Sequence, residues 1–61
     1  MTMTGKEMVK LLVANGWETL RIHGSHHVMV KGSKTIVVPV HGNSDLKPGL
    51  LNAILKSAGL K

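Results

Sequence analysis

Hydrophobic residues recur at helical spacing near the N-terminus, over residues 8–13. Thr4 and Glu7 have the spacing of a capping box, in which each side chain satisfies a free backbone amide. Gly16 follows the run and is typical of a helix end. The pattern therefore predicts a helix over residues 5–15.

A second helical pattern lies near the C-terminus. Its apolar stripe follows the spacing i, i+3, i+4, i+7 and consists of Leu51, Ile54, Leu55 and Ala58. Pro48 fits the first turn of such a helix, because its missing N–H group would have no partner there. Gly59 should end the helix, with Leu60 placed to fold back onto the last turn.

Between these helices the pattern is typical of β-strands, with short apolar runs and alternating polar residues. The predicted strands run from Trp17 to Ile22, from His26 to Lys31, and from Lys34 or Thr35 to Val40. In the first strand, Leu20 and Ile22 should share one face, and Thr19 and Arg21 the other, because side chains alternate along a strand.

The second and third strands are joined by Gly32-Ser33, which fits a two-residue hairpin turn with glycine first. Centring the hairpin on this turn sets His26 opposite Pro39. Diagonal neighbours on a sheet lie ~7–8 Å apart. His41, two residues beyond Pro39, can therefore approach His26.

The predicted order is helix, three strands, helix. This is an α+β fold with both helices on one face of an antiparallel sheet. Double-stranded-RNA-binding domains share the same order of elements. The chain has 61 residues and no cysteine, so we expect one domain, residues 1–61, without a disulfide.

The chain is basic, with eight Lys and Arg residues against three Asp and Glu residues and a net charge of +5. Such a charge favours polyanionic partners through counterion release, although an ordinary solvated lysine surface is the alternative. No apolar run approaches the ~18 residues of a membrane span, and residues 1–10 contain no signal-peptide segment. We expect a cytoplasmic protein with no membrane partner.

Two stretches carry candidate chemistry, Gly24-Ser25-His26-His27 and Pro39-Val40-His41-Gly42. In each, a histidine stands near a glycine at a predicted strand edge. A histidine side chain can take and give a proton near neutral pH, and glycine permits a sharp bend or the close approach of a ligand. We interpret His26 as a general acid or base, the alternative being a polar residue that opens a strand.

The neighbouring residues have supporting or structural interpretations. Ser25 would orient the catalytic imidazole or merely serve the turn, and Gly24 would shape the bend. His41 is a second proton-transfer candidate, unless it only fixes the shape of its own loop. His27 should point to the opposite face of the sheet, and His23 is a weaker candidate.

The four histidines could also bind a metal. A structural zinc site needs four suitably spaced ligands, and sites made of histidine alone are a minority. Neither predicted helix carries a histidine pair at metal-binding spacing, and the chain has few carboxylates. We therefore expect no metal and no small-molecule cofactor.

The order and spacing of these motifs resemble the HicA mRNA interferases, the toxin half of HicA–HicB toxin–antitoxin pairs. The resemblance covers nearly the whole chain. It rests on Thr4-Gly5-Lys6-Glu7, Leu11-Leu12, Asn15-Gly16-Trp17, Gly24-Ser25-His26-His27, Pro39-Val40-His41-Gly42, Leu46-Lys47-Pro48-Gly49, Ile54-Leu55-Lys56 and Ala58-Gly59-Leu60.

The resemblance implies a double-stranded-RNA-binding-like fold, cleavage of messenger RNA and a HicB antitoxin that covers the active site. The family's catalytic histidine directly follows Gly-Ser, which makes it His26 here. Family members often carry an aromatic residue just beyond the second histidine, where this chain has Val28-Met29. This departure concerns packing more than chemistry.

We therefore predict the toxin of a type II pair, a metal-independent endoribonuclease that inhibits translation until a HicB-type antitoxin neutralises it. Lys6, Lys34 and Lys47 are candidate phosphate contacts, chosen for their positions near helix starts or the hairpin. Two other functions stay open at this point. One is a basic module that binds RNA without cutting it, and the other is an interaction protein whose basic face binds an acidic partner.

Overall fold

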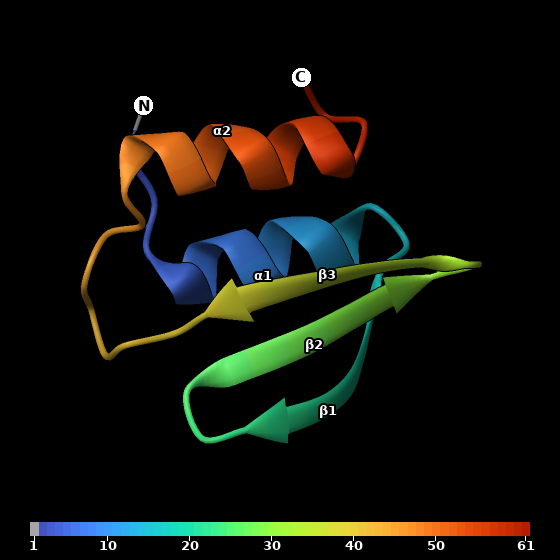
Figure 1. The fold of residues 1–61 in the computed structure, drawn as a ribbon, viewed down its shortest axis with the longest axis horizontal. Coiled ribbons are helices and arrows are strands. Elements are labelled where there is room, and N and C mark those ends of the chain that lie inside the picture. The colour runs from blue at the N-terminus through green and yellow to red at the C-terminus, as the bar shows by residue number, and fades with distance from the viewer. Residues whose placement is uncertain (1) are drawn as a thin grey trace.

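A computed structural model describes residues 2–61 of the chain as a helix, three strands and a second helix (Figure 1). The predicted domain of residues 1–61 begins at Met1, which lies outside the described residues. The elements are α1 (Gly5–Ala14), β1 (Glu18–His23), β2 (His26–Lys31), β3 (Lys34–Pro39) and α2 (Pro48–Ser57). The predicted α+β order is confirmed, and most element ends fall within a residue of their predicted positions.

The helix ends follow from local hydrogen bonds. The hydroxyl of Thr4 accepts a bond from the Glu7 N–H group at 3.2 Å, and the Glu7 carboxylate accepts one from the Thr4 N–H group at 2.8 Å. This is the predicted capping box. Both helices end in the same way, with the N–H groups of Trp17 and Leu60 donating to carbonyl groups in the last turn.

The strands form one antiparallel sheet in the order β1-β2-β3. The register between β2 and β3 is the predicted one, with Lys31 opposite Lys34 and His26 opposite Pro39. Side chains therefore alternate as expected along these two strands. Met29 lies on the face that packs against the helices, and His26 lies on the other face.

The predicted alternation along β1 is wrong. The register against β2 shifts between Thr19 and Arg21, so Leu20 is an extra residue in the strand, a β-bulge. Consequently Thr19 and Ile22 pair with residues of the helix-facing side, and Arg21 faces the other way. Leu20 is 58% exposed and Ile22 56% exposed, because the helices cover little of this outer strand.

Both helices bury their apolar stripes against one face of the sheet. The buried hydrophobic core consists of Met8, Leu12, Trp17, Met29, Ile36, Val38, Leu46, Leu51, Ile54 and Leu55. α1 contacts all three strands, whereas α2 contacts β3. In Figure 1 the two helices run in the same direction. Among residues 2–61, no helix combines the length and hydrophobicity needed to cross a membrane.

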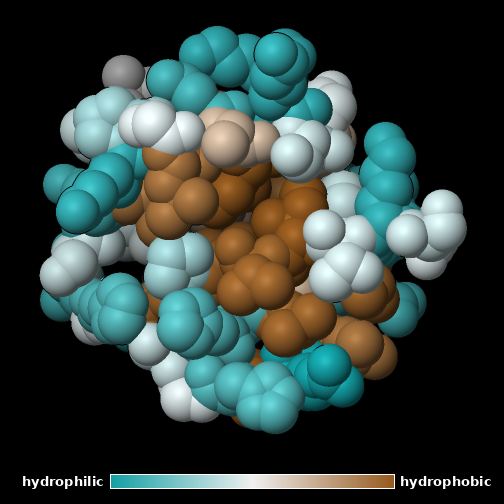
Figure 2. All heavy atoms as spheres, viewed as in Figure 1, coloured by the Kyte–Doolittle hydropathy of each residue, from teal (hydrophilic) through white to brown (hydrophobic). Residues whose placement is uncertain are grey.

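The surface seen in this view is not uniformly polar. Figure 2 shows hydrophobic atoms gathered in the centre of the face, with polar atoms around its rim. On the open face of the sheet, Val37 is 47% exposed and pairs with the half-buried Val28. An apolar surface with a polar rim is typical of a contact surface for another molecule.

Gly5 is the point at which α1 touches the end of β3. A Cβ atom on this buried residue would overlap the carbonyl oxygen of Pro39 and lie 2.9 Å from the Cα atom of Val40. Both are backbone atoms, so they cannot rotate out of the way. The start of α1 therefore packs directly against the backbone at residues 39–40.

Gly5→Ala should lower the free energy of unfolding by about 1–3 kcal/mol, the usual cost of overpacking. Gly49→Ala is the matched control in the first turn of α2, where an added Cβ meets no atom within 4 Å. It should leave stability unchanged or raise it by up to about 1 kcal/mol. Urea unfolding followed by the fluorescence of Trp17 measures both. Equal stability of the Gly5→Ala variant and the natural chain would contradict the close contact.

Candidate functional site

The turn between β1 and β2 sets the position of His26. Gly24 has φ +56°, a conformation that other residues rarely adopt, and with Ser25 it forms a two-residue hairpin turn. The carbonyl oxygen of Ser25 accepts a hydrogen bond from the Val40 N–H group at 2.6 Å. This bond fastens the turn to the chain leaving β3. Ser25 thus acts on the position of His26 through its backbone.

His41 lies close to His26, as the register predicts. The centroids of the two imidazole rings are 6.4 Å apart, and the ring planes are nearly perpendicular, at 80°. Both side chains are exposed. Because a hydrogen bond from each ring spans about 2.8 Å, both rings can reach oxygen atoms of one phosphate group. Two exposed imidazoles at this distance can take one proton and give another.

The other two histidines lie on opposite faces of the sheet. His27 is half-buried and pairs with the buried Val38, so it points away from the His26 face, as predicted. His23 pairs directly with His26 and shares its face. The predicted first strand ends at Ile22 and therefore misses this pairing. The signal was available, because the Gly-Ser pair that precedes His26 recurs at the second turn of the sheet.

The segment before α1 fixes the loop between β3 and α2. Thr4 forms a β-bridge with Asp45, and the carbonyl oxygen of Met3 accepts a bond from the Leu46 N–H group at 2.7 Å. Within the loop, the Ser44 N–H group donates to the carbonyl oxygen of His41 at 2.9 Å. The loop that carries His41 is therefore tied at both ends to regular structure.

The predicted phosphate contacts divide into two groups. Lys6 directly follows Gly5, which touches the backbone beyond β3, and Lys47 lines the same pocket as His41. Lys47 and the backbone of Lys6 therefore lie at the same end of the molecule as the paired imidazoles. Lys34 is at the other end of β3, roughly 17 Å from Pro39, because a strand rises roughly 3.3 Å per residue. It cannot contact the same phosphate.

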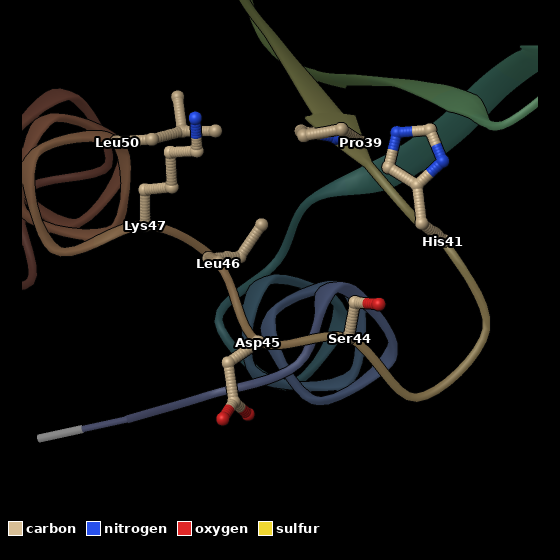
Figure 3. A pocket seen from close by; sticks show the side chains of 7 residues that line it. All are labelled: Pro39, His41, Ser44, Asp45, Leu46, Lys47 and Leu50. Carbon is tan, nitrogen blue, oxygen red and sulfur yellow. The ribbon is translucent and has the colours of Figure 1, made fainter.

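A pocket of about 380 Å³ lies beside His41, between the loop and the start of α2 (Figure 3). Its lining residues are Pro39, His41, Ser44, Asp45, Leu46, Lys47 and Leu50. The Asp45 carboxylate points away from the other labelled side chains, whereas Lys47 extends beside Leu50. The pocket was not predicted from the sequence, because the strand end, loop and helix start within residues 39–50 face one another only in the folded chain.

The acidic residues at this end of the molecule do not join the histidines as ligands for a metal ion. The carboxylate of Glu7 is bonded to the Thr4 N–H group, and that of Asp45 points away from the pocket. In the part of the chain that the structure describes, no three His, Asp or Glu side chains are grouped so that they could hold a metal ion. The arrangement is therefore two imidazoles with neighbouring lysines.

Comparison with known protein families gives one match. Residues 5–60 match the family model described as "HicA toxin of bacterial toxin-antitoxin". The match includes the turn that carries His26, the end of β3, the loop that carries His41 and the start of α2. No curated protein sequence matches the chain.

Proposed function

The chain belongs to the HicA family of toxins from bacterial toxin–antitoxin systems, and on this premise we propose that it is a metal-independent endoribonuclease acting on mRNA in the cytoplasm. The observation that carries the proposal is the exposed pair His26 and His41, 6.4 Å apart on a chain of net charge +5. RNA supplies its own nucleophile, the 2′-hydroxyl group. The protein need only move protons and hold the phosphate.

In the proposed reaction, His26 takes the proton of the 2′-hydroxyl group, and the freed oxygen attacks the neighbouring phosphorus. The bond from phosphorus to the 5′-oxygen breaks, and His41 gives a proton to that oxygen. The products are a 2′,3′-cyclic phosphate and a 5′-hydroxyl end. General acid–base catalysis of this kind contributes typically 10²–10⁴-fold to a rate.

The lysines would supply the positive charge that the reaction needs. Lys6 and Lys47 lie on the same end of the molecule as the imidazoles and would stabilise the phosphate as its negative charge increases. Lys34, at the far end of β3, would contact another phosphate of the same RNA strand. Lys31 has a structural role instead. Its ammonium donates a hydrogen bond to the carbonyl oxygen of Asn15 at 2.8 Å and so caps α1.

His26→Ala should reduce RNA cleavage at least 100-fold, because the variant loses the group that takes the proton. His27→Gln is the matched control, since the neighbouring imidazole lies on the opposite face of the sheet. Both variants should unfold at the same urea concentration as the natural chain within error. The assay measures cleavage of a defined RNA in a chelator. Full activity of folded His26→Ala would refute the assignment. If the natural chain binds the RNA but leaves it uncut, the chain would instead be a binding module.

RNA affinity should fall steeply with salt, because each neutralised phosphate releases counterions. Lys6→Gln and Lys47→Gln should each reduce the salt slope by about one unit. Lys56→Gln removes the same charge from the last turn of α2 and should leave the slope unchanged. Binding is measured with the inactive His26→Ala chain at several salt concentrations. An equal effect of all three substitutions would show that only total charge matters.

A toxin of such a pair needs an antitoxin, and we propose a HicB-type protein that covers His26. An acidic partner suits this basic chain, because complementary charge speeds association. Val37, which is 47% exposed on the same face of the sheet as His26, would add apolar area to such a complex. Covering the two imidazoles would silence the enzyme without altering its fold.

The complex should bury roughly 1,200–2,000 Å², the usual range for a specific pair. His26→Ala should bind the antitoxin nearly as tightly as the natural chain, because one exposed imidazole adds little area. Hydrogen exchange of the purified pair should show protection of residues 23–27 and 39–47. Protection confined to other residues, in a complex that still cleaves RNA, would disprove silencing by coverage.

A further inference from the structure

The pocket beside His41 is placed to receive part of any RNA that the imidazoles engage. His41 belongs to both features, since its ring lies 6.4 Å from that of His26 and also lines the pocket. A phosphate held between the two rings therefore brings its own nucleoside to the mouth of the pocket. The volume of about 380 Å³ is within the range of sites that bind small ligands, ~300–1,000 Å³.

The lining suits a flat ring with polar edges. Pro39, Leu46 and Leu50 supply apolar surface, and the hydroxyl of Ser44 and the ammonium of Lys47 supply hydrogen-bonding groups. In Figure 3 the Asp45 carboxylate points away from this space, so it does not repel an anionic strand there. An apolar slot with a few polar groups is the usual composition of a ligand site.

The described residues offer no exposed Phe, Tyr or Trp side chain on which a base could stack. Proteins that bind single-stranded RNA commonly stack bases on aromatic side chains. Here the sequence contains no Phe and no Tyr, and the single tryptophan, Trp17, is only 2% exposed. Stacking contacts to a base next to the site would therefore come from imidazole rings or from aliphatic and proline side chains. The pocket offers these next to the imidazole pair.

We propose that this pocket binds one nucleobase of the RNA, the base adjacent to the phosphate that is cleaved. The inference rests on the proposed ribonuclease function and adds a determinant of cleavage position to it. Pro39 and Leu50 form the walls of the base site, and Ser44 contacts the edge of the base. Lys47, which also lines the pocket, contacts the adjoining phosphate.

Leu50→Glu tests the site, with Val13→Glu as its matched control. Leu50 is 39% exposed and Val13 is 53% exposed, so neither substitution removes core packing. Both replace an exposed aliphatic helix residue with the same charge, but Val13 does not line the pocket. A glutamate in the first turn of α2 is also compatible with the helix dipole.

The first measurement is an NMR titration of the purified chain with adenosine and uridine 5′-monophosphates, and with ribose 5-phosphate. A nucleotide should shift the amide signals of residues 44, 46 and 50. Ribose 5-phosphate should not shift them, because it can occupy only the phosphate site at Lys47. Leu50→Glu should weaken nucleotide binding at least tenfold, and Val13→Glu should not. Equal shifts with ribose 5-phosphate would overturn the proposal, because the site would then bind phosphate alone.

The second measurement maps cleavage positions in a defined RNA. Leu50→Glu should change the distribution of cuts, and Val13→Glu should reproduce the natural pattern. An unchanged cleavage pattern in Leu50→Glu would contradict the base site. So would a Leu50→Glu defect in antitoxin binding alone, because the pocket would then serve another role. Nucleotide binding without any cleavage by the natural chain would contradict the ribonuclease function and leave the base site intact, so the two failures are distinguishable.

Discussion

The backbone at Pro39 and Val40 holds the functional end of this molecule together. On one side the Val40 N–H group bonds to the carbonyl oxygen of Ser25, which fixes the turn before His26. On the other side α1 packs so closely against the same backbone that only glycine fits at position 5. His41 is the next residue along the chain. The separation of the two imidazoles therefore depends on one short segment at the end of β3.

This arrangement explains how so small a chain could carry out the proposed reaction. The chemistry needs proton transfer at two positions, and the strand end supplies two exposed imidazoles. RNA provides the nucleophile, and lysines at the starts of both helices provide positive charge. The loop between β3 and α2, tied to the segment before α1 by Thr4 and Leu46, holds the adjoining pocket open. Fold and proposed function thus share the same contacts.

The sequence predicts most of what local rules control. The capping box at Thr4 and the turn at Gly32-Ser33 each have a residue signature, and the turn alone sets the register that brings His41 near His26. The bulge at Leu20 has no such signature, because an alternating pattern looks the same with or without an extra residue. The close contact at Gly5 joins segments far apart in the chain, and the pocket depends on how residues 39–50 turn back on themselves. No local pattern encodes either feature.

The most direct test of the central claim is the chemistry of the cut ends. A defined RNA is incubated with the natural chain in buffer that contains a chelator, and the fragments are identified by mass spectrometry. A second RNA, with a 2′-deoxy nucleotide at the cleaved position, is treated in the same way as a control. Attack by the 2′-oxygen predicts 2′,3′-cyclic phosphate and 5′-hydroxyl ends, and an uncut deoxy position. Fragments with 5′-phosphate ends, or a cut at the deoxy position, would contradict the account.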